Sequence, residues 1–155
     1  MPRRLAHQAG LRHETGLPMT AALSPEVRAL LEAPNYAHLA TVARDGSPRS
    51  VAVWVGLEGD RILIGAGQDS MKARTTRREP RVAISATDRD NPYRSAMILG
   101  RVVEQRNDED GTVMNAIARK YTGEPYPWNG PGRRMLVIEP ERALYTDLPF
   151  THQPE

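Results

Sequence analysis

The chain has 155 residues, enough for one domain with a sizeable core but too few for two independent domains. The absence of cysteine excludes disulfides, iron–sulfur clusters, thiolate zinc sites and cysteine nucleophiles, and the four scattered histidines lack metal-ligand spacing, so we expect no metal. With 21 basic and 19 acidic residues the net charge is only +2, and no apolar run reaches the roughly 20 residues of a membrane span. We therefore expect a cytoplasmic protein that binds neither nucleic acid nor membrane.

The chain is predicted to divide into three parts. Residues 1–18 have no apolar periodicity and are predicted to form a disordered leader, and residues 149–155 are predicted to form a C-terminal tail. The residues between them, 19–148, are predicted to form a single domain. No repeat or low-complexity block interrupts it.

The domain is predicted to start with a short helix and a hairpin. Ser24 is a favourable N-cap, Pro25 suits the first helical position, and Pro34 ends the apolar stripe. Two β-rich segments follow at 36–43 and 49–57, separated by an Asp-Gly pair that favours a tight hairpin turn.

Strands dominate the rest of the pattern. A turn at 58–60 precedes further predicted strands at residues 61–67, 81–87, 95–105, 135–139 and 143–147. Six to seven short antiparallel strands, joined mainly by hairpins, indicate a mainly β fold with flanking helices. The expected architecture is an antiparallel barrel whose openings are covered by helices.

Two further helices are predicted between strands. The first occupies about 70–78, capped by Asp69 or Ser70 and stopped by Pro80. The second is predicted to have Asn107 as its cap, the three acidic residues that follow in its first turn, and Gly123 beyond its end.

The basic segment 70–78 is the first candidate site. A strand ends and a helix begins there, so free backbone N–H groups and the positive end of a helix dipole meet a hydroxyl and a lysine, which favours an anion site. Helical spacing places Arg74, Arg77 and Arg78 on one arc and Lys72 elsewhere, so the four cations cannot all bind one phosphate. Ser70, Lys72 and Arg74 are the best candidates. A solvated basic helix face explains the pattern about equally well.

Three groups of aromatic residues are further candidates. Trp54 lies within a predicted strand that could offer a wall to a flat ring, although a buried core tryptophan explains it equally well. Tyr126 and Trp128 lie on a loop stiffened by prolines, where aromatics serve ligands or pack on neighbours. Tyr93 and Arg94 lie in a turn before a long strand, where a purely structural role is the simpler interpretation.

The order of the motifs resembles the pyridoxamine 5'-phosphate oxidase-like superfamily, and within it the coenzyme F420-dependent oxidoreductases. The resemblance extends from about Ala33 to Leu144. Each motif alone is weak, but their order and spacing are specific. They are Ala37–Val42, Asp45–Pro48, Val53–Val55, Lys72–Arg74, Arg77–Ala83, Asp90–Arg94, Gly100–Val103, Ala118–Tyr121 and Tyr126–Trp128.

This resemblance implies a split β-barrel homodimer, of the FMN-binding type, with a flavin-like ring at the subunit interface. The phosphate of the cofactor would be held by Lys72 and Arg74, with Ser70 and Met71 alongside. The ring would lie against the second strand, and four other residues would form a wall of the pocket or bind the substrate. The strand residues are Ser50, Val51, Val53 and Trp54, and the wall residues are Tyr93, Arg94, Tyr126 and Trp128.

The activity implied is hydride transfer from reduced coenzyme F420 to an activated C=C bond or similar small-molecule acceptor, with no side chain assigned as catalytic. Two alternatives stay open: an FMN-dependent oxidase or reductase on the same fold, and a carrier that binds deazaflavin or flavin without catalysis. The sequence departs from many relatives at Thr75-Thr76 and at Leu99. Its C-terminus lacks the pattern of true pyridoxine phosphate oxidases, which argues against vitamin B6 synthesis.

Overall fold

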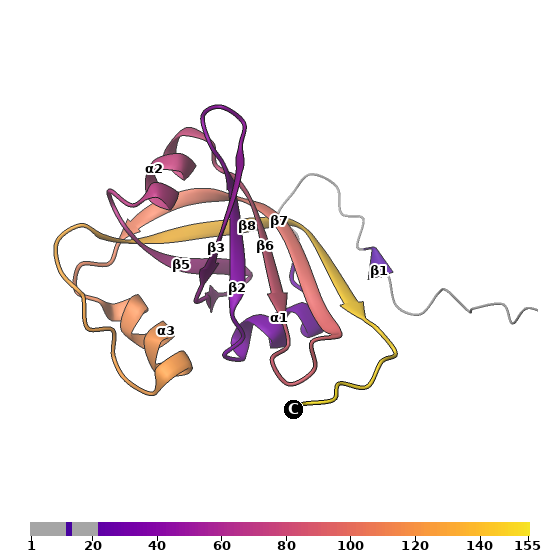
Figure 1. The fold of residues 1–155 in the computed structure, drawn as a ribbon. Coiled ribbons are helices and arrows are strands. Elements are labelled where there is room, and N and C mark those ends of the chain that lie inside the picture. Colours follow the sequence, from indigo (N-terminus) through magenta and orange to yellow (C-terminus); the bar gives the residue numbers. More distant parts are fainter. Residues whose placement is uncertain (1–11, 14–21) are drawn as a thin grey trace, which may run out of the picture.

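The computed structural model describes residues 12–13 and 22–155, and these form one antiparallel sheet with three helices (Figure 1). The strands are β1 (Arg12–His13), β2 (Ala37–Val42), β3 (Pro48–Val53), β4 (Gly56–Glu58), β5 (Arg61–Gly67), β6 (Arg81–Thr87), β7 (Arg94–Asn107) and β8 (Arg133–Asp147). Seven strands lie in the order β3-β2-β6-β7-β8-β5-β4, and β1 pairs with β8. The predicted split β-barrel is confirmed. The predicted leader lies outside the described residues except for β1.

The helices are α1 (Pro25–Glu32), α2 (Met71–Arg78) and α3 (Thr112–Thr122). The predicted caps of the first two are confirmed: the hydroxyl of Ser24 accepts from the N–H of Val27, and that of Ser70 accepts from the N–H of Ala73, each at 3.3 Å. In Figure 1, α1 lies below the strands, whereas α2 and α3 lie on one side. None of these helices is long and apolar enough to cross a membrane.

The first hairpin forms as predicted, but its second strand is shorter than expected. Gly46 adopts a φ of +86° in the turn between β2 and β3. The expected single strand over 49–57 is wrong, because β3 pairs with β2 and β4 pairs with β5 at the opposite edge of the sheet. The chain changes direction at Trp54 and Val55, where the Val55 N–H donates to the Tyr121 hydroxyl (3.2 Å).

β8 is continuous, so the prediction of two strands on either side of Pro140 is wrong. Pro140 lies opposite Gly100, and the next paired residue, Arg142, lies opposite Leu99. One extra residue is therefore accommodated on β8, which is a β-bulge. A bulge tolerates the missing N–H of proline, and this is why the strand continues.

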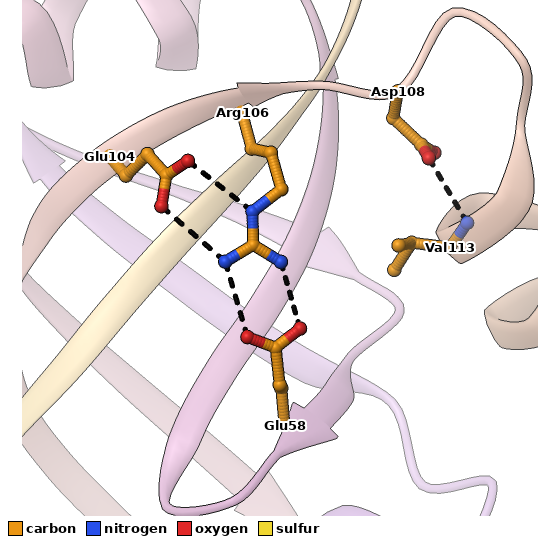
Figure 2. Close-up of polar contacts among 5 residues, drawn as sticks. All are labelled: Glu58, Glu104, Arg106, Asp108 and Val113. Carbon is orange, nitrogen blue, oxygen red and sulfur yellow. Dashed lines mark hydrogen bonds and ion pairs between the residues drawn. The ribbon is translucent and has the colours of Figure 1, made fainter.

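The predicted start of α3 at Asn107 is also wrong. Asn107 is the last residue of β7, and the helix begins after Gly111, whose φ is +74° and which has no side chain to act as a cap. The buried carboxylate of Asp108 acts as the cap instead. It accepts from the N–H of Val113 (3.0 Å; Figure 2) and from the N–H of Met114 (2.9 Å). The acidic run therefore caps the helix from a preceding loop.

An ion-pair network joins the β4–β5 hairpin to β7. Figure 2 shows the guanidinium of Arg106 between two carboxylates, with bonds of 2.8 and 3.1 Å to Glu58 and of 3.3 and 3.4 Å to Glu104. The bond pair with Glu58 is bidentate, the geometry in which a surface ion pair contributes most.

Two apolar clusters form the core. The larger fills the barrel and includes Val27, Leu30 and Leu31 of α1. The smaller joins α3 to one face of β5 and β8 through Leu63, Met114, Ile117, Met135 and Val137, with Trp54, Val113, Tyr121 and Tyr126 at its margin. The candidate site lies at that margin.

Candidate functional site

A cavity of about 290 Å³ opens where the end of β3, β5, α2 and α3 meet. Its walls are mostly apolar or aromatic, and Lys72 is the one lining residue with a cationic side chain. The lining residues are Tyr36, Ala52, Val53, Trp54, Ile64, Gly65, Lys72, Met114 and Tyr126. The structure thus brings four of the predicted binding residues to one place, namely Val53, Trp54, Lys72 and Tyr126.

The N-terminus of α2 lies at the edge of this cavity. The first hydrogen bond within the helix is donated by the N–H of Arg74 to the carbonyl of Ser70 (3.0 Å). The N–H groups of Met71 and Lys72, which come earlier in the chain, therefore have no acceptor within the helix. The Met71 side chain is exposed. Two candidate positions of the predicted anchor, Ser70 and Lys72, therefore lie beside donors that an anion can use.

Lys72 is half-buried and has no hydrogen-bond acceptor for its amine among the described residues. Burial lowers the pKa of Lys72 below its usual value, and the positive charge of Arg133 lowers it further. An ammonium in this position lacks a counter-charge. A bound anion would supply one.

The other arginines of α2 differ in their contacts. Arg77 donates to the carbonyl of Gln68 (2.7 Å) and to the side chain of Gln105 (3.1 Å), and Arg78 donates to the carbonyl of Val42 (3.1 Å). These guanidinium groups bridge the helix to its neighbours. Arg74 is exposed and has no hydrogen-bond or ion-pair partner among residues 22–155.

Arg133, the first residue of β8, is not among the binding residues predicted from the sequence. Its Nε is the only buried side-chain nitrogen or oxygen without a hydrogen-bond partner in the described part of the chain. Its guanidinium lies 5.1 Å from the centre of the Tyr126 ring, and a terminal nitrogen lies beside Gly65. Arg133 is opposite Gly67 in the sheet, a pairing that local sequence does not reveal.

A series of aromatic rings forms one wall. Trp54 stacks on Tyr121, with 5.3 Å between ring centres and 9° between planes, and meets Tyr126 edge-on at 6.4 Å. Trp128 continues the series at 5.4 Å from Tyr126, but its side chain is 70% exposed. Asn115 holds this loop by accepting from the Tyr126 N–H (3.0 Å).

The predicted ring-binding strand, β3, is an edge strand with one free side. Ser50 and Val51 are exposed, whereas Val53 is buried against the core. Edge strands leave backbone groups unpaired, and a ligand or another chain can use them.

The structure does not bring Tyr93 and Arg94 to this cavity. Tyr93 packs edge-on against Phe150 at 5.2 Å, and the guanidinium of Arg94 lies 3.6 Å from the Asp147 carboxylate. Arg94 lines a separate cavity beside α1. Within residues 12–13 and 22–155, no group of three or more histidine, aspartate or glutamate side chains is placed to hold a metal ion.

The family model described as pyridoxamine 5'-phosphate oxidase matches residues 23–147, which include every strand of the barrel except β1. The chain belongs to the pyridoxamine 5'-phosphate oxidase family. A comparison with curated protein sequences gave no match.

The same fold is found among solved structures. An F420 reductase is 32% identical, with a TM-score of 0.68, 75% of this chain covered and 94% of the other. A conserved hypothetical protein of Mycobacterium tuberculosis is 23% identical, with a TM-score of 0.70 and coverages of 88% and 94%. A Listeria innocua protein described as a pyridoxamine 5'-phosphate oxidase is 20% identical, with a TM-score of 0.62 and coverages of 77% and 94%.

Family membership and the F420 reductase together support a flavin- or deazaflavin-binding oxidoreductase. The chemistry of the cavity lining suits such a group. Its aromatic and apolar walls suit a flat ring, and the unpaired cations of Lys72 and Arg133 suit its phosphate.

Proposed function

We propose that the protein is a reductase that passes hydride from reduced coenzyme F420 to an activated C=C bond, or a similar acceptor, of a small molecule. The single observation that carries the proposal is the 32% identity to an F420 reductase over 75% of the chain. The cavity also supports the proposal. The phosphate of such a cofactor would pair with the cations that lack acceptors, and its ring would fill the apolar space beside them.

In this proposal Lys72 and Arg74 bind the phosphate, and the N–H groups of Met71 and Lys72 add donors beside Ser70. The ring lies along Ser50, Val51, Val53 and Trp54. Those contacts orient the ring and shield it from water.

Reduced coenzyme F420 would supply the hydride, and water the proton that completes reduction of the C=C bond. The side chains of the cavity act by binding and orientation. We assign none of them a proton-transfer role.

The cavity of one chain is small for this task. Its volume of about 290 Å³ is at the low end of the roughly 300–1,000 Å³ of ligand pockets. Ser50, Ala40, Ala83 and Leu99 lie side by side across β3, β2, β6 and β7. Met97 and Leu99 on this face are 44% and 37% exposed. We therefore propose a homodimer through this face, because a second copy there would cover Ser50 and enlarge the site.

An activity screen tests the proposal. The protein is mixed with reduced coenzyme F420 and a panel of enones, quinones and tetrapyrroles, and reoxidation is followed by the return of deazaflavin absorbance. We expect reoxidation with at least one acceptor and none without protein.

The FMN-dependent alternative is favoured by the family itself, and reduction of the same panel only with FMN would support it. If coenzyme F420 binds and no acceptor in a broad panel is reduced, the protein is a carrier rather than a reductase.

A further inference from the structure

We infer that Arg133 of β8 is a second phosphate-binding residue, which holds the anion of the cofactor jointly with Lys72 of α2. The inference rests on the proposed function only in taking the ligand of this cavity to be phosphorylated. It adds a residue from a different element to the helical anchor, and it gives an acceptor to the buried Nε of Arg133, which has none among the described residues.

The Arg133 side chain has an aromatic neighbour, Tyr126, but no carboxylate or carbonyl partner among the described residues. Three other partly buried cations have acceptors: Arg106 bonds to Glu58, Arg134 to Glu109 and Gln68, and Lys120 to the carbonyl of Leu31 (2.8 Å). No hydrogen bond or ion pair of the Arg133 side chain exists among the described residues, and its Nε is buried. Such a donor is costly to leave without an acceptor.

The surroundings of Arg133 place its guanidinium beside the cavity. A Cβ at Gly65 would lie 3.6 Å from one terminal nitrogen, and a Cβ at Gly67 would lie 3.8 Å from the other. The two glycines therefore let the guanidinium lie against the backbone of β5, and Tyr126 covers it from another direction at 5.1 Å. Gly65 and Tyr126 both line the cavity. The group is thus fixed between two lining residues.

Lys72 and Arg133 are close enough for the charge of one to act on the other. The positive charge of Arg133 contributes to the lowered pKa of Lys72. Two cations that repel each other in the free protein would both be stabilised by one anion between them. A phosphate offers several oxygens to the fork of Arg133, to the amine of Lys72 and to the first N–H groups of α2.

The test compares ligands that differ only in the phosphorylated part. Affinities of wild type, Arg133→Gln and Arg133→Lys are measured for FMN and riboflavin, and for coenzyme F420 and its deazaflavin core without phosphate. Arg119→Gln is the matched control, because Arg119 is an exposed arginine of α3 and loses the same charge. Circular dichroism and the unfolding midpoint verify that each variant folds.

For whichever cofactor wild type binds, FMN or coenzyme F420, we expect Arg133→Gln to lose about tenfold in affinity. For the matching ligand without phosphate, riboflavin or the deazaflavin core, the loss should be less than about twofold. Arg133→Lys should lose less, because it keeps the charge without the fork. The unfolding midpoint of ligand-free Arg133→Gln should be equal to or above that of wild type. Equal losses for both members, or no loss for either, would overturn the inference.

Inorganic phosphate separates this inference from the proposed function. At matched ionic strength, phosphate should raise the unfolding midpoint of wild type and of Arg119→Gln, but not that of Arg133→Gln. If wild type binds neither FMN nor coenzyme F420 and this difference persists, the proposed function fails and the Arg133 site stands. If phosphate acts equally on wild type and Arg133→Gln, or on neither, the site fails.

Discussion

Trp54 stacks on Tyr121 with 5.3 Å between ring centres and only 9° between ring planes. The hydroxyl of Tyr121 accepts from the N–H of Val55 (3.2 Å) and donates to the carbonyl of Asn35 (2.7 Å). Tyr121 therefore connects α3 to the chain on both sides of the first hairpin. The stacking fixes the orientation of Trp54 before any ligand arrives, which reduces the entropic cost of binding.

Replacing Trp54 should weaken ring binding rather than phosphate binding. Trp54→Leu removes an aromatic wall of the cavity, so we expect a loss of about fivefold or more for a cofactor with or without its phosphate. Affinities for FMN and riboflavin, or for coenzyme F420 and its core, measure the effect. Tyr121→Phe keeps the stacked ring but loses two hydrogen bonds, so it should lower stability by about 1–2 kcal/mol with a smaller change in affinity. A loss confined to the phosphorylated ligands would contradict this role of Trp54.

Removing either helical cation should weaken cofactor binding with little loss of stability. Lys72→Ala and Arg74→Ala are each expected to cost about 1 kcal/mol or more in binding, because charge-assisted bonds are lost. Arg119→Ala removes an equal charge from an exposed position and should leave the affinity nearly unchanged. Fluorescence titration measures all three. Unchanged affinity in both anchor variants would remove them from the site.

Cofactor affinity should fall as the pH rises through the alkaline range. Burial and the charge of Arg133 lower the pKa of Lys72 below its usual value, and a bound anion favours the protonated amine. Above the pKa of free Lys72, binding must therefore be accompanied by proton uptake, so affinity decreases with rising pH.

Titrations between pH 7 and pH 11 would reveal the midpoint of this fall. In Arg133→Gln the midpoint should move upward, because one cause of the lowered pKa is removed. A midpoint that does not move would show that Arg133 has no influence on Lys72.

The buried cap of α3 should matter for stability and not for binding chemistry. Asp108→Ala removes the acceptor of two backbone N–H groups, so we expect a loss of about 1–3 kcal/mol in the free energy of unfolding. Asp110→Ala is the comparison. Asp110 is exposed and accepts from the N–H of Thr112 (3.0 Å), so its loss should be smaller. Urea unfolding measures both, and equal effects would argue against Asp108 as the main cap.

Local pattern predicted the parts of the fold that local chemistry decides. Ser24 and Ser70 are caps because their hydroxyls accept from an N–H three residues later, and the Asp-Gly pair makes the first hairpin turn. Pro140 misled the prediction because the bulge that accommodates it depends on Gly100 of another strand. Asp108 was misplaced because it caps α3 from outside the helix.

The candidate site likewise has one part that local sequence predicts and one part that it does not. Lys72 belongs to a helix start that sequence can reveal, whereas Arg133 follows a glycine- and proline-rich stretch that reads as an ordinary loop. Its place beside the cavity depends on pairing between β5 and β8 and on the glycines opposite it. Such long-range register is not contained in a local pattern.

The proposed dimer face can be disrupted at one position. Leu99→Arg places a charge on the exposed face of β7, and we expect it to shift the protein to monomer and to weaken cofactor binding. Leu148→Arg is a control with similar exposure, beyond the end of β8. Sedimentation velocity gives the oligomeric state. A wild type that is monomeric with bound cofactor would contradict the interface.

The central claim is that the cavity binds a deazaflavin cofactor, and a parallel titration of wild type with coenzyme F420 and FMN tests it most directly. Fluorescence of each ligand is followed under the same buffer and salt conditions. The account predicts saturable binding of coenzyme F420 at least about tenfold tighter than that of FMN, a difference of about 1.4 kcal/mol. Tight binding of FMN with no binding of coenzyme F420 would contradict it.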